Sequence, residues 1–287
     1  MALFPTLSLF SAGDGPVRRK AMDLLRRIVE GKATPVQGGM GTIALVGTGP
    51  GAADLLTVRA VDRIRTAEVI FYDRLVDPEV LEYADARAEK VYVGKEVGAH
   101  AWPQERINAA IVAEALRGRR VVRLKSGDPG VFGRAGEELT AAAEHAIPVE
   151  MVPGVTAACA AASAMGQSLT ERGVSDTLIL TTAMGRAGDP LPDCARMSAP
   201  GTTTAFYMGV RQAGRIAQAL QGRGLPQDAP ITVAVEVSKP GQRVFRTDLG
   251  DMPDLIAREG ITGCAILMVT WPEARVALTE TPVAAMV

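Results

Sequence analysis

The stretch that most constrains the fold is VVRLKSGDPGVFGRAGEEL, residues 121–139. Its first four residues are mostly apolar and β-branched, which is the composition of a short buried strand. The next part holds Gly127, Pro129, Gly130 and Gly133, a density of breakers that excludes both helix and strand. From Arg134 the spacing turns helical, and acidic residues in the first turn suit the positive end of a helix dipole. The stretch therefore predicts a strand, an exposed loop and a helix, either as an ordinary connection or as a ligand-binding edge of an α/β domain.

A second glycine loop favours the ligand-binding alternative. Gly-Thr-Gly-Pro-Gly at 47–51 follows the apolar run at 43–46. It could be a nucleotide-binding turn, with Asp73 at the end of the next strand taking a ribose hydroxyl. However, Pro50 lacks an N–H for a phosphate, and Ala52 stands where the last glycine of that motif belongs. A glycine turn of this kind also suits S-adenosylmethionine, which has no phosphate, so the residues alone leave both ligands open.

The order of apolar and helical segments predicts an α/β protein. Short strands at 43–46, 68–72, 90–93 and 121–124 alternate with helices at 55–65, 104–116 and 135–145, which favours a mostly parallel sheet covered on both faces. The later segments predict strands at 178–182, 203–208, 231–237, 243–246 and 264–270, and helices at 156–165, 212–221 and 252–259. The alternating strand at 243–246 is expected to pair antiparallel with its predecessor, giving a mixed second sheet.

We expect four parts along the chain. Residues 1–40 form an N-terminal extension with an amphipathic helix, 41–152 an N-terminal α/β domain, 153–272 a C-terminal α/β domain, and 273–287 a tail.

Composition excludes several classes of function. Arg and Lys number 31 and Asp and Glu 32, so net charge gives no support to a nucleic-acid or membrane-surface role. Aromatic residues make up only 4%, which argues against a base-stacking platform. The three dispersed cysteines form no disulfide framework and predict a cytoplasmic location, and two isolated histidines argue against a histidine metal site. We therefore expect a small-molecule partner and no metal.

Six segments together resemble the tetrapyrrole methylase family: GTGPGAADLLTVRA (47–60), YDRLV (72–76), VGKEVGAH (93–100), RLKSGDPGVFGRAGEE (123–138), VPGVTAA (152–158) and FYMG (206–209). They follow the family's order and spacing over roughly 41–270. The resemblance implies two α/β domains with S-adenosylmethionine in the cleft between them, usually in a homodimer, and it displaces the nucleotide interpretation.

Within the family the chain is most similar to the members that methylate uroporphyrinogen III at C2 and C7. They produce precorrin-2 for siroheme and cobalamin biosynthesis. Two alternatives stay open: another precorrin methylase, or a regulatory member that binds the methyl donor without catalysis.

The resemblance also assigns roles to single residues. Asp73 falls on the position of the proton acceptor and Lys95 on that of the proton donor. Arg134, Arg74 and Lys125 are expected to contact the substrate, because arginine and lysine bind its eight carboxylates. The methyl donor would be held at Pro50, Ser126, Gly127, Asp128, Val131, Thr156, Ala157, Met208 and Val237.

These residue types suit the chemistry. A reduced pyrrole carbon can attack a sulfonium methyl once the two are held in line, and a carboxylate can then accept the proton that leaves the ring. The alternative for each basic residue is a solvated surface charge, and for Asp73 a cap of its own turn. The chain departs from the family pattern at several positions. Among them, Gly130 replaces an aromatic residue, and Glu96 follows Lys95 where relatives commonly carry arginine.

Overall fold

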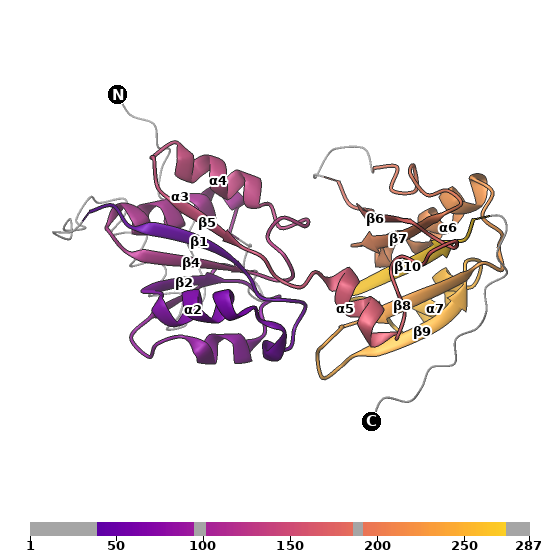
Figure 1. Ribbon diagram of the computed structural model, residues 1–287, viewed down its shortest axis with the longest axis horizontal. Helices are drawn as coiled ribbons and strands as arrows, with labels where there is room; N and C mark the ends of the chain where they lie inside the picture. Colours follow the sequence, from indigo (N-terminus) through magenta and orange to yellow (C-terminus); the bar gives the residue numbers. More distant parts are fainter. Residues whose placement is uncertain (1–38, 95–101, 186–191, 274–287) are drawn as a thin grey trace, which may run out of the picture.

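The computed structural model describes residues 39–94, 102–185 and 192–273 (Figure 1). The amphipathic helix expected before residue 40, and nearly all of the tail expected after residue 272, lie outside the described residues. So do Lys95 and Glu96.

The first half of the chain forms a five-stranded sheet in the order β3-β2-β4-β1-β5. Every pairing in it is parallel, which confirms the predicted parallel arrangement. Because parallel strands share one direction, their carboxyl ends meet at one edge of the sheet. The strands are β1 (Thr42–Gly47), β2 (Val69–Tyr72), β3 (Glu89–Tyr92), β4 (Arg120–Lys125) and β5 (Val149–Val152).

Helices cover both faces of this sheet, which is why its strands are nearly continuous apolar runs. On one face α3 (Gln104–Leu116) and α4 (Ala135–Ala143) pack over side chains such as Leu45 and Phe71. On the other face α2 (Val58–Thr66) and the 3₁₀ helix η2 (Pro78–Tyr83) pack over Val46 and Ile70. A shorter 3₁₀ turn, η1 (Ala53–Leu55), leads into α2.

The second half forms a mixed sheet in the order β6-β7-β10-β8-β9. Only β6 and β7 run parallel; the other pairs, including β8 with β9, are antiparallel as expected. The strands are β6 (Thr177–Thr182), β7 (Thr202–Tyr207), β8 (Pro230–Val235), β9 (Arg243–Asp248) and β10 (Ala265–Trp271).

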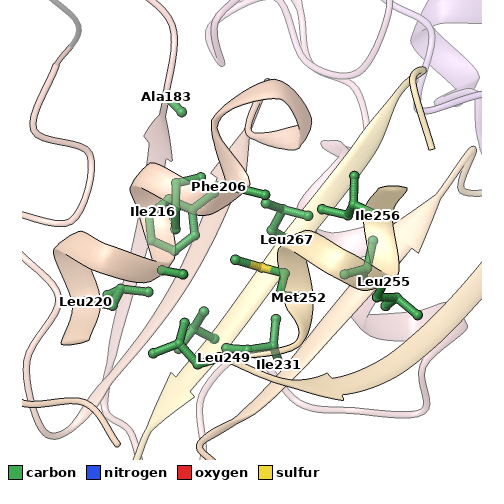
Figure 2. Close-up of a cluster of buried hydrophobic side chains, with 14 of the residues drawn as sticks. Ala183, Phe206, Ile216, Leu220, Ile231, Leu249, Met252, Leu255, Ile256 and Leu267 are labelled. Carbon is green, nitrogen blue, oxygen red and sulfur yellow. The ribbon is translucent and has the colours of Figure 1, made fainter. Parts of the chain in front are cut away.

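The second sheet is also covered on both faces. The helices α6 (Ala213–Gly222) and α7 (Met252–Arg258), with the short η3 (Val210–Gln212), enclose a core that includes Phe206, Leu220 and Leu267 (Figure 2). The alanine-rich α5 (Ala157–Ala164) packs on the opposite face, against Ala205, Ala234 and Met268. Small side chains on α5 allow a close approach of helix to sheet.

The two sheets lie at opposite ends of the molecule, and the chain passes between them through the connection from β5 to α5 (Figure 1). The carboxyl ends of the first-sheet strands point toward the second half. We keep the domain limits of 41–152 and 153–272 as a proposal, supported by the separate sheets. Within the described ranges, no helix has the length and apolar character needed to cross a membrane.

Candidate functional site

The loops after β1, β4 and β5 touch one another directly through glycines. Gly49 and Gly127 exchange two backbone hydrogen bonds: the Gly127 N–H donates at 2.7 Å and the Gly49 N–H at 3.2 Å. A Cβ on Gly47 would lie 2.6 Å from the Gly154 nitrogen, and one on Gly154 would overlap the Gly127 carbonyl oxygen. Gly49 and Gly127 also have φ of +71° and +73°, which glycine adopts without strain. We call these four residues the glycine floor.

Asp128 fastens this floor in place. Its Oδ1 accepts the Gly130 N–H at 2.7 Å, and its Oδ2 accepts the Gly154 N–H at 3.0 Å. Because both oxygens bind backbone, the side chain holds the loop after β4 against the connection from β5 to α5. Any contact of Asp128 with a ligand would add to this bracing role.

The second half reaches the same place through Tyr207, the last residue of β7. Its hydroxyl lies 2.6 Å from Thr156 Oγ1 and accepts the Ala158 N–H at 3.0 Å. Its ring centre is 4.9 Å from that of Phe132, in the loop after β4. Burial raises the pKa of the Tyr207 hydroxyl, so the phenol keeps its proton at neutral pH.

A second contact between the halves follows β8. The Ala52 N–H donates to Ser238 Oγ at 3.1 Å, and the stem of Lys239 lies over Gly51. Loops from both sheets therefore meet in one region. We call this region the junction and define it as residues 47–52, 126–134, 153–158, 207–209 and 236–239.

Strained backbone is concentrated at the junction. Among the described residues other than glycine, six have positive φ, and all but Ala146 lie in the junction: Phe132, Arg134, Met208, Glu236 and Ser238. Such conformations cost about 1–3 kcal/mol each and persist where the surrounding structure holds them. Their gathering in one place points to a functional region.

A network of charged side chains connects the end of β2 with β4 and α4. Asp73 Oδ2 accepts from Arg123 at 2.7 Å, and Lys125 Nζ lies 2.6 Å from Glu138 Oε2. Arg123 Nε is 3.4 Å from Glu138 Oε1, without a hydrogen bond. Asp73 also accepts the Leu75 N–H at 3.0 Å, so it caps its own turn while 26% of its side chain stays exposed. Asp73 is thus both braced and accessible.

The four basic residues expected to work on the substrate are placed differently. Lys125 is only 5% exposed, and burial lowers its pKa although Glu138 opposes that effect. Arg134 is exposed and grips Glu137 with two contacts of 2.8 Å. Arg74 is exposed in the turn after β2, and Lys95 lies outside the described residues. The alternative expectation that Lys125 is a solvated surface charge is wrong, because its side chain is buried and paired with Glu138.

The positions expected to hold the methyl donor all lie in the junction loops. Val237 is buried among α5 residues that include Ala158. The others lie at strand ends or at the start of α5: Pro50, Ser126, Gly127, Asp128, Val131, Thr156, Ala157 and Met208. Their roles, like those of the catalytic and substrate-binding residues, stay predictions.

Sequence reasoning missed Tyr207, which binds the start of α5 from 49 positions away, and Ser238, which joins the halves over 186 positions. The one available signal was a polar ring at the end of the apolar strand before Met208. Glu138 was expected only as a first-turn acid. In the structure it is fully buried, and it pairs with Lys125.

Two grooves lie away from the junction. One of about 530 Å³ runs between α3 and α4, and one of about 450 Å³ lies beside Tyr83. Three of their lining residues border the junction: Ala53, beside the loop after β1, and Gly136 and Glu137, just after the loop that follows β4. The other lining residues lie outside the junction. We place the site at the junction because five strand ends converge there, the position at which α/β sheets bind ligands. Over the described ranges, no cluster of His, Cys, Asp or Glu could hold a metal ion.

The chain resembles several characterised proteins. A siroheme synthase of Pseudomonas putida is 39% identical over 258 residues, covering 90% of this chain and 54% of that protein. The chain spans about half the length of the curated relatives it matches. Their whole activity therefore does not transfer with the resemblance.

Solved structures match over nearly the full length of their chains. A Thermus thermophilus uroporphyrin-III C-methyltransferase, complexed with S-adenosyl homocysteine, is 35% identical with a TM-score of 0.67 and covers 80% of this chain and 97% of its own. A cobalt precorrin-4 methyltransferase is 27% identical with a TM-score of 0.71, covering 80% of this chain and 95% of its own. The sequence model of the Tetrapyrrole (Corrin/Porphyrin) Methylases matches residues 42–253, and the chain belongs to that family.

Proposed function

We propose that the chain transfers methyl groups from S-adenosylmethionine to C2 and C7 of uroporphyrinogen III, giving precorrin-2 for siroheme and cobalamin biosynthesis. The single observation that carries the proposal is the junction, where three strand ends of the first sheet meet two of the second. Support comes from the family and from the names of the Pseudomonas putida and Thermus thermophilus relatives.

The junction suits a donor that lacks a phosphate. A Cβ on Gly127 would meet only the Thr156 Cα, at 3.9 Å, so one face of the glycine floor is open beside the start of α5. Backbone and small side chains border that face, and Pro50 offers no N–H. We infer that the methyl donor binds there and supplies the electrophilic methyl group. Met208 and Val237 would line the side formed by the second half.

Asp73 is suited to accept a proton. In the reaction a pyrrole carbon forms a new C–C bond to the methyl group while the C–S bond breaks, and a proton must then leave the ring. The Arg123 contact at 2.7 Å fixes one carboxylate oxygen, and part of the side chain still faces solvent. We keep Asp73 as the proton acceptor and Lys95 as the donor.

The basic residues would bind the substrate in different ways. Arg74 is exposed and can contact a carboxylate directly. Arg134 can do so by exchanging Glu137 for a substrate carboxylate, since the pair is exposed and therefore weak. Breaking the buried pair of Lys125 and Glu138 would be costly. We therefore propose that Lys125 supports the loop from below.

In the decisive experiment the purified protein is incubated with enzymatically made uroporphyrinogen III and S-adenosylmethionine, and the masses of the products are determined by mass spectrometry. We expect the addition of two methyl groups, and we expect Asp73→Asn to abolish it while the protein stays folded. A second candidate, methylation of another precorrin, is favoured by the likeness to the cobalt precorrin-4 methyltransferase. Unchanged uroporphyrinogen with a methylated precorrin in a parallel assay would replace our choice by that candidate.

We also propose that the chain forms a homodimer and acts in the cytoplasm. The edge strand β6 carries Leu178, Ile179 and Leu180, none of which is buried, and an apolar edge of this kind is commonly covered by a partner. Light scattering of the purified protein tests the dimer. The three cysteines are free, which suits a reducing compartment.

A further inference from the structure

Tyr207 contacts both halves of the junction with one side chain. It ends β7, in the second sheet, and its hydroxyl touches Thr156 and Ala158 at the start of α5, which packs on that sheet. Its ring also packs on Phe132 from the loop after β4. Because the predicted donor-binding positions Thr156 and Met208 lie beside these contacts, the orientation of Tyr207 affects both sides of the proposed site.

The N-terminus of α5 is not capped by the side chain of its own N-cap residue, Thr156. Thr156 has the extended backbone of an N-cap residue, with φ −73° and ψ 149°, but its hydroxyl accepts no hydrogen bond from its own helix. The first amides of a helix need acceptors from outside the helix. The Ala158 N–H finds one in the Tyr207 oxygen, 49 positions away. Tyr207, at the end of β7, therefore caps the helix that packs on its own sheet.

The same contact determines which way the Thr156 hydroxyl points. The geometry allows either hydroxyl to donate in this bond. We assign the donor to Tyr207, because a phenol is a stronger hydrogen-bond donor than an aliphatic alcohol. The lone pairs of the Tyr207 oxygen then accept the Ala158 N–H. The proton of Thr156 is consequently left for another acceptor. Thr156 is only partly buried and borders the open face of Gly127, so a ligand in the junction can be that acceptor.

We propose that Tyr207 is a positioning residue that caps α5 at the junction and leaves the Thr156 hydroxyl to donate to the methyl donor. This inference rests on the proposed function for its ligand. It differs from a purely structural role, because a structural tyrosine would contribute to folding without directing a proton of Thr156.

The test uses Tyr207→Phe, which keeps the ring contact with Phe132 and removes only the hydroxyl. We expect S-adenosylhomocysteine, measured by calorimetry, to bind about tenfold more weakly, the effect of one lost hydrogen bond with an unpaired partner. Thr156→Val should weaken binding similarly, whereas Thr156→Ser should retain it. In the double variant of Tyr207→Phe and Thr156→Val, the loss should not exceed that of the worse single variant, because the two act through one bond. The control is Tyr83→Phe. Tyr83 lies in η2 with the Arg65 guanidinium over its ring, and this variant should bind S-adenosylhomocysteine as the wild type does.

Amide exchange in the ligand-free protein separates this inference from the proposed function. We expect Ala158 to exchange faster in Tyr207→Phe, while Ala234 in β8 keeps its protection. If the wild-type protein fails to bind S-adenosylhomocysteine, the proposed function fails, but the cap can still be measured by exchange. If the wild type binds and Tyr207→Phe matches it in both affinity and exchange, the inference is wrong. Should Tyr207→Phe not fold, the affinities of Thr156→Val and Thr156→Ser decide instead, and equal binding by these two variants would contradict the inference.

Discussion

In the second half of the chain, β7, β10, α6 and α7 surround Phe206, Leu220 and Leu267, which are fully buried apolar side chains (Figure 2). At the junction, backbone touches backbone, and the halves are joined by a hydrogen bond to Ser238 and by the ring contact of Tyr207 with Phe132. The core gains stability from the apolar area that it removes from water. The junction instead contains left-handed residues that cost free energy. Stability and ligand binding are thus assigned to different parts of the molecule, and substitutions should affect them separately.

The largest effect on stability is expected from the core. Leu220→Ala removes a fully buried side chain from α6 and leaves a cavity, so the free energy of unfolding should fall by about 2–5 kcal/mol. Because Leu220 lies outside the junction, the affinity of the folded protein for S-adenosylhomocysteine should not change. Urea denaturation and calorimetry measure the two quantities. A large loss of affinity at a temperature where the variant is folded would contradict the separation.

A smaller loss of stability with a larger loss of binding is expected at the glycine floor. Gly154→Ala forces a Cβ against the Gly127 carbonyl oxygen, so the loops must move apart. We expect about 1–3 kcal/mol of destabilisation, the usual effect of overpacking, and loss of measurable donor binding. The matched control is Gly214→Ala in α6, where a Cβ meets nothing within 4 Å. That change should stabilise the protein by about 0.5–1 kcal/mol and leave binding intact. Equal donor binding by both variants would show that the glycine floor is not part of the binding site.

The smallest effect concerns the pH dependence of stability. Burial lowers the pKa of Lys125 below its ordinary value of 10.5. Between the lowered pKa and 10.5 the unfolded chain binds more protons than the folded protein, so this residue makes stability rise with pH in that window. Denaturation across the alkaline range should show a steeper rise for the wild type than for the double variant Lys125→Met with Glu138→Leu, in which neither charge is left unpaired. Parallel curves would mean that Lys125 titrates alike in both states.

Regular elements were predictable from the sequence because local pattern determines them. The helix expected at 104–116 is α3 with the same ends, and the alternating strand at 243–246 is the first part of β9. The 3₁₀ helix η2 was not predicted, since six residues beginning at Pro78 give too short a periodic signal. The strand-end loops were placed correctly because parallel strands bring their carboxyl ends together.

The details of the site depend on contacts that no local pattern contains. Whether Lys125 faces solvent or Glu138 depends on how α4 lies on the sheet, and the residue types are the same in both cases. The cap that Tyr207 gives to α5 depends on how α5 packs on the second sheet. Positive φ at Met208 and Arg134 is likewise imposed by the surrounding structure, because neither residue favours it intrinsically.

The glycine floor also limits how such a protein can change its ligand. Gly47 and Gly154 leave no room for any side chain. Substitutions at these two positions therefore cannot add a charged or bulky group to the base of the site. New specificity must therefore arise at the rim, from positions such as Gly130 or Arg134, where a larger group can be admitted by shifting a neighbour. A library randomised at the rim should then yield folded variants with altered ligand selectivity. A library randomised at the glycine floor should yield mostly variants in which the three loops cannot pack together.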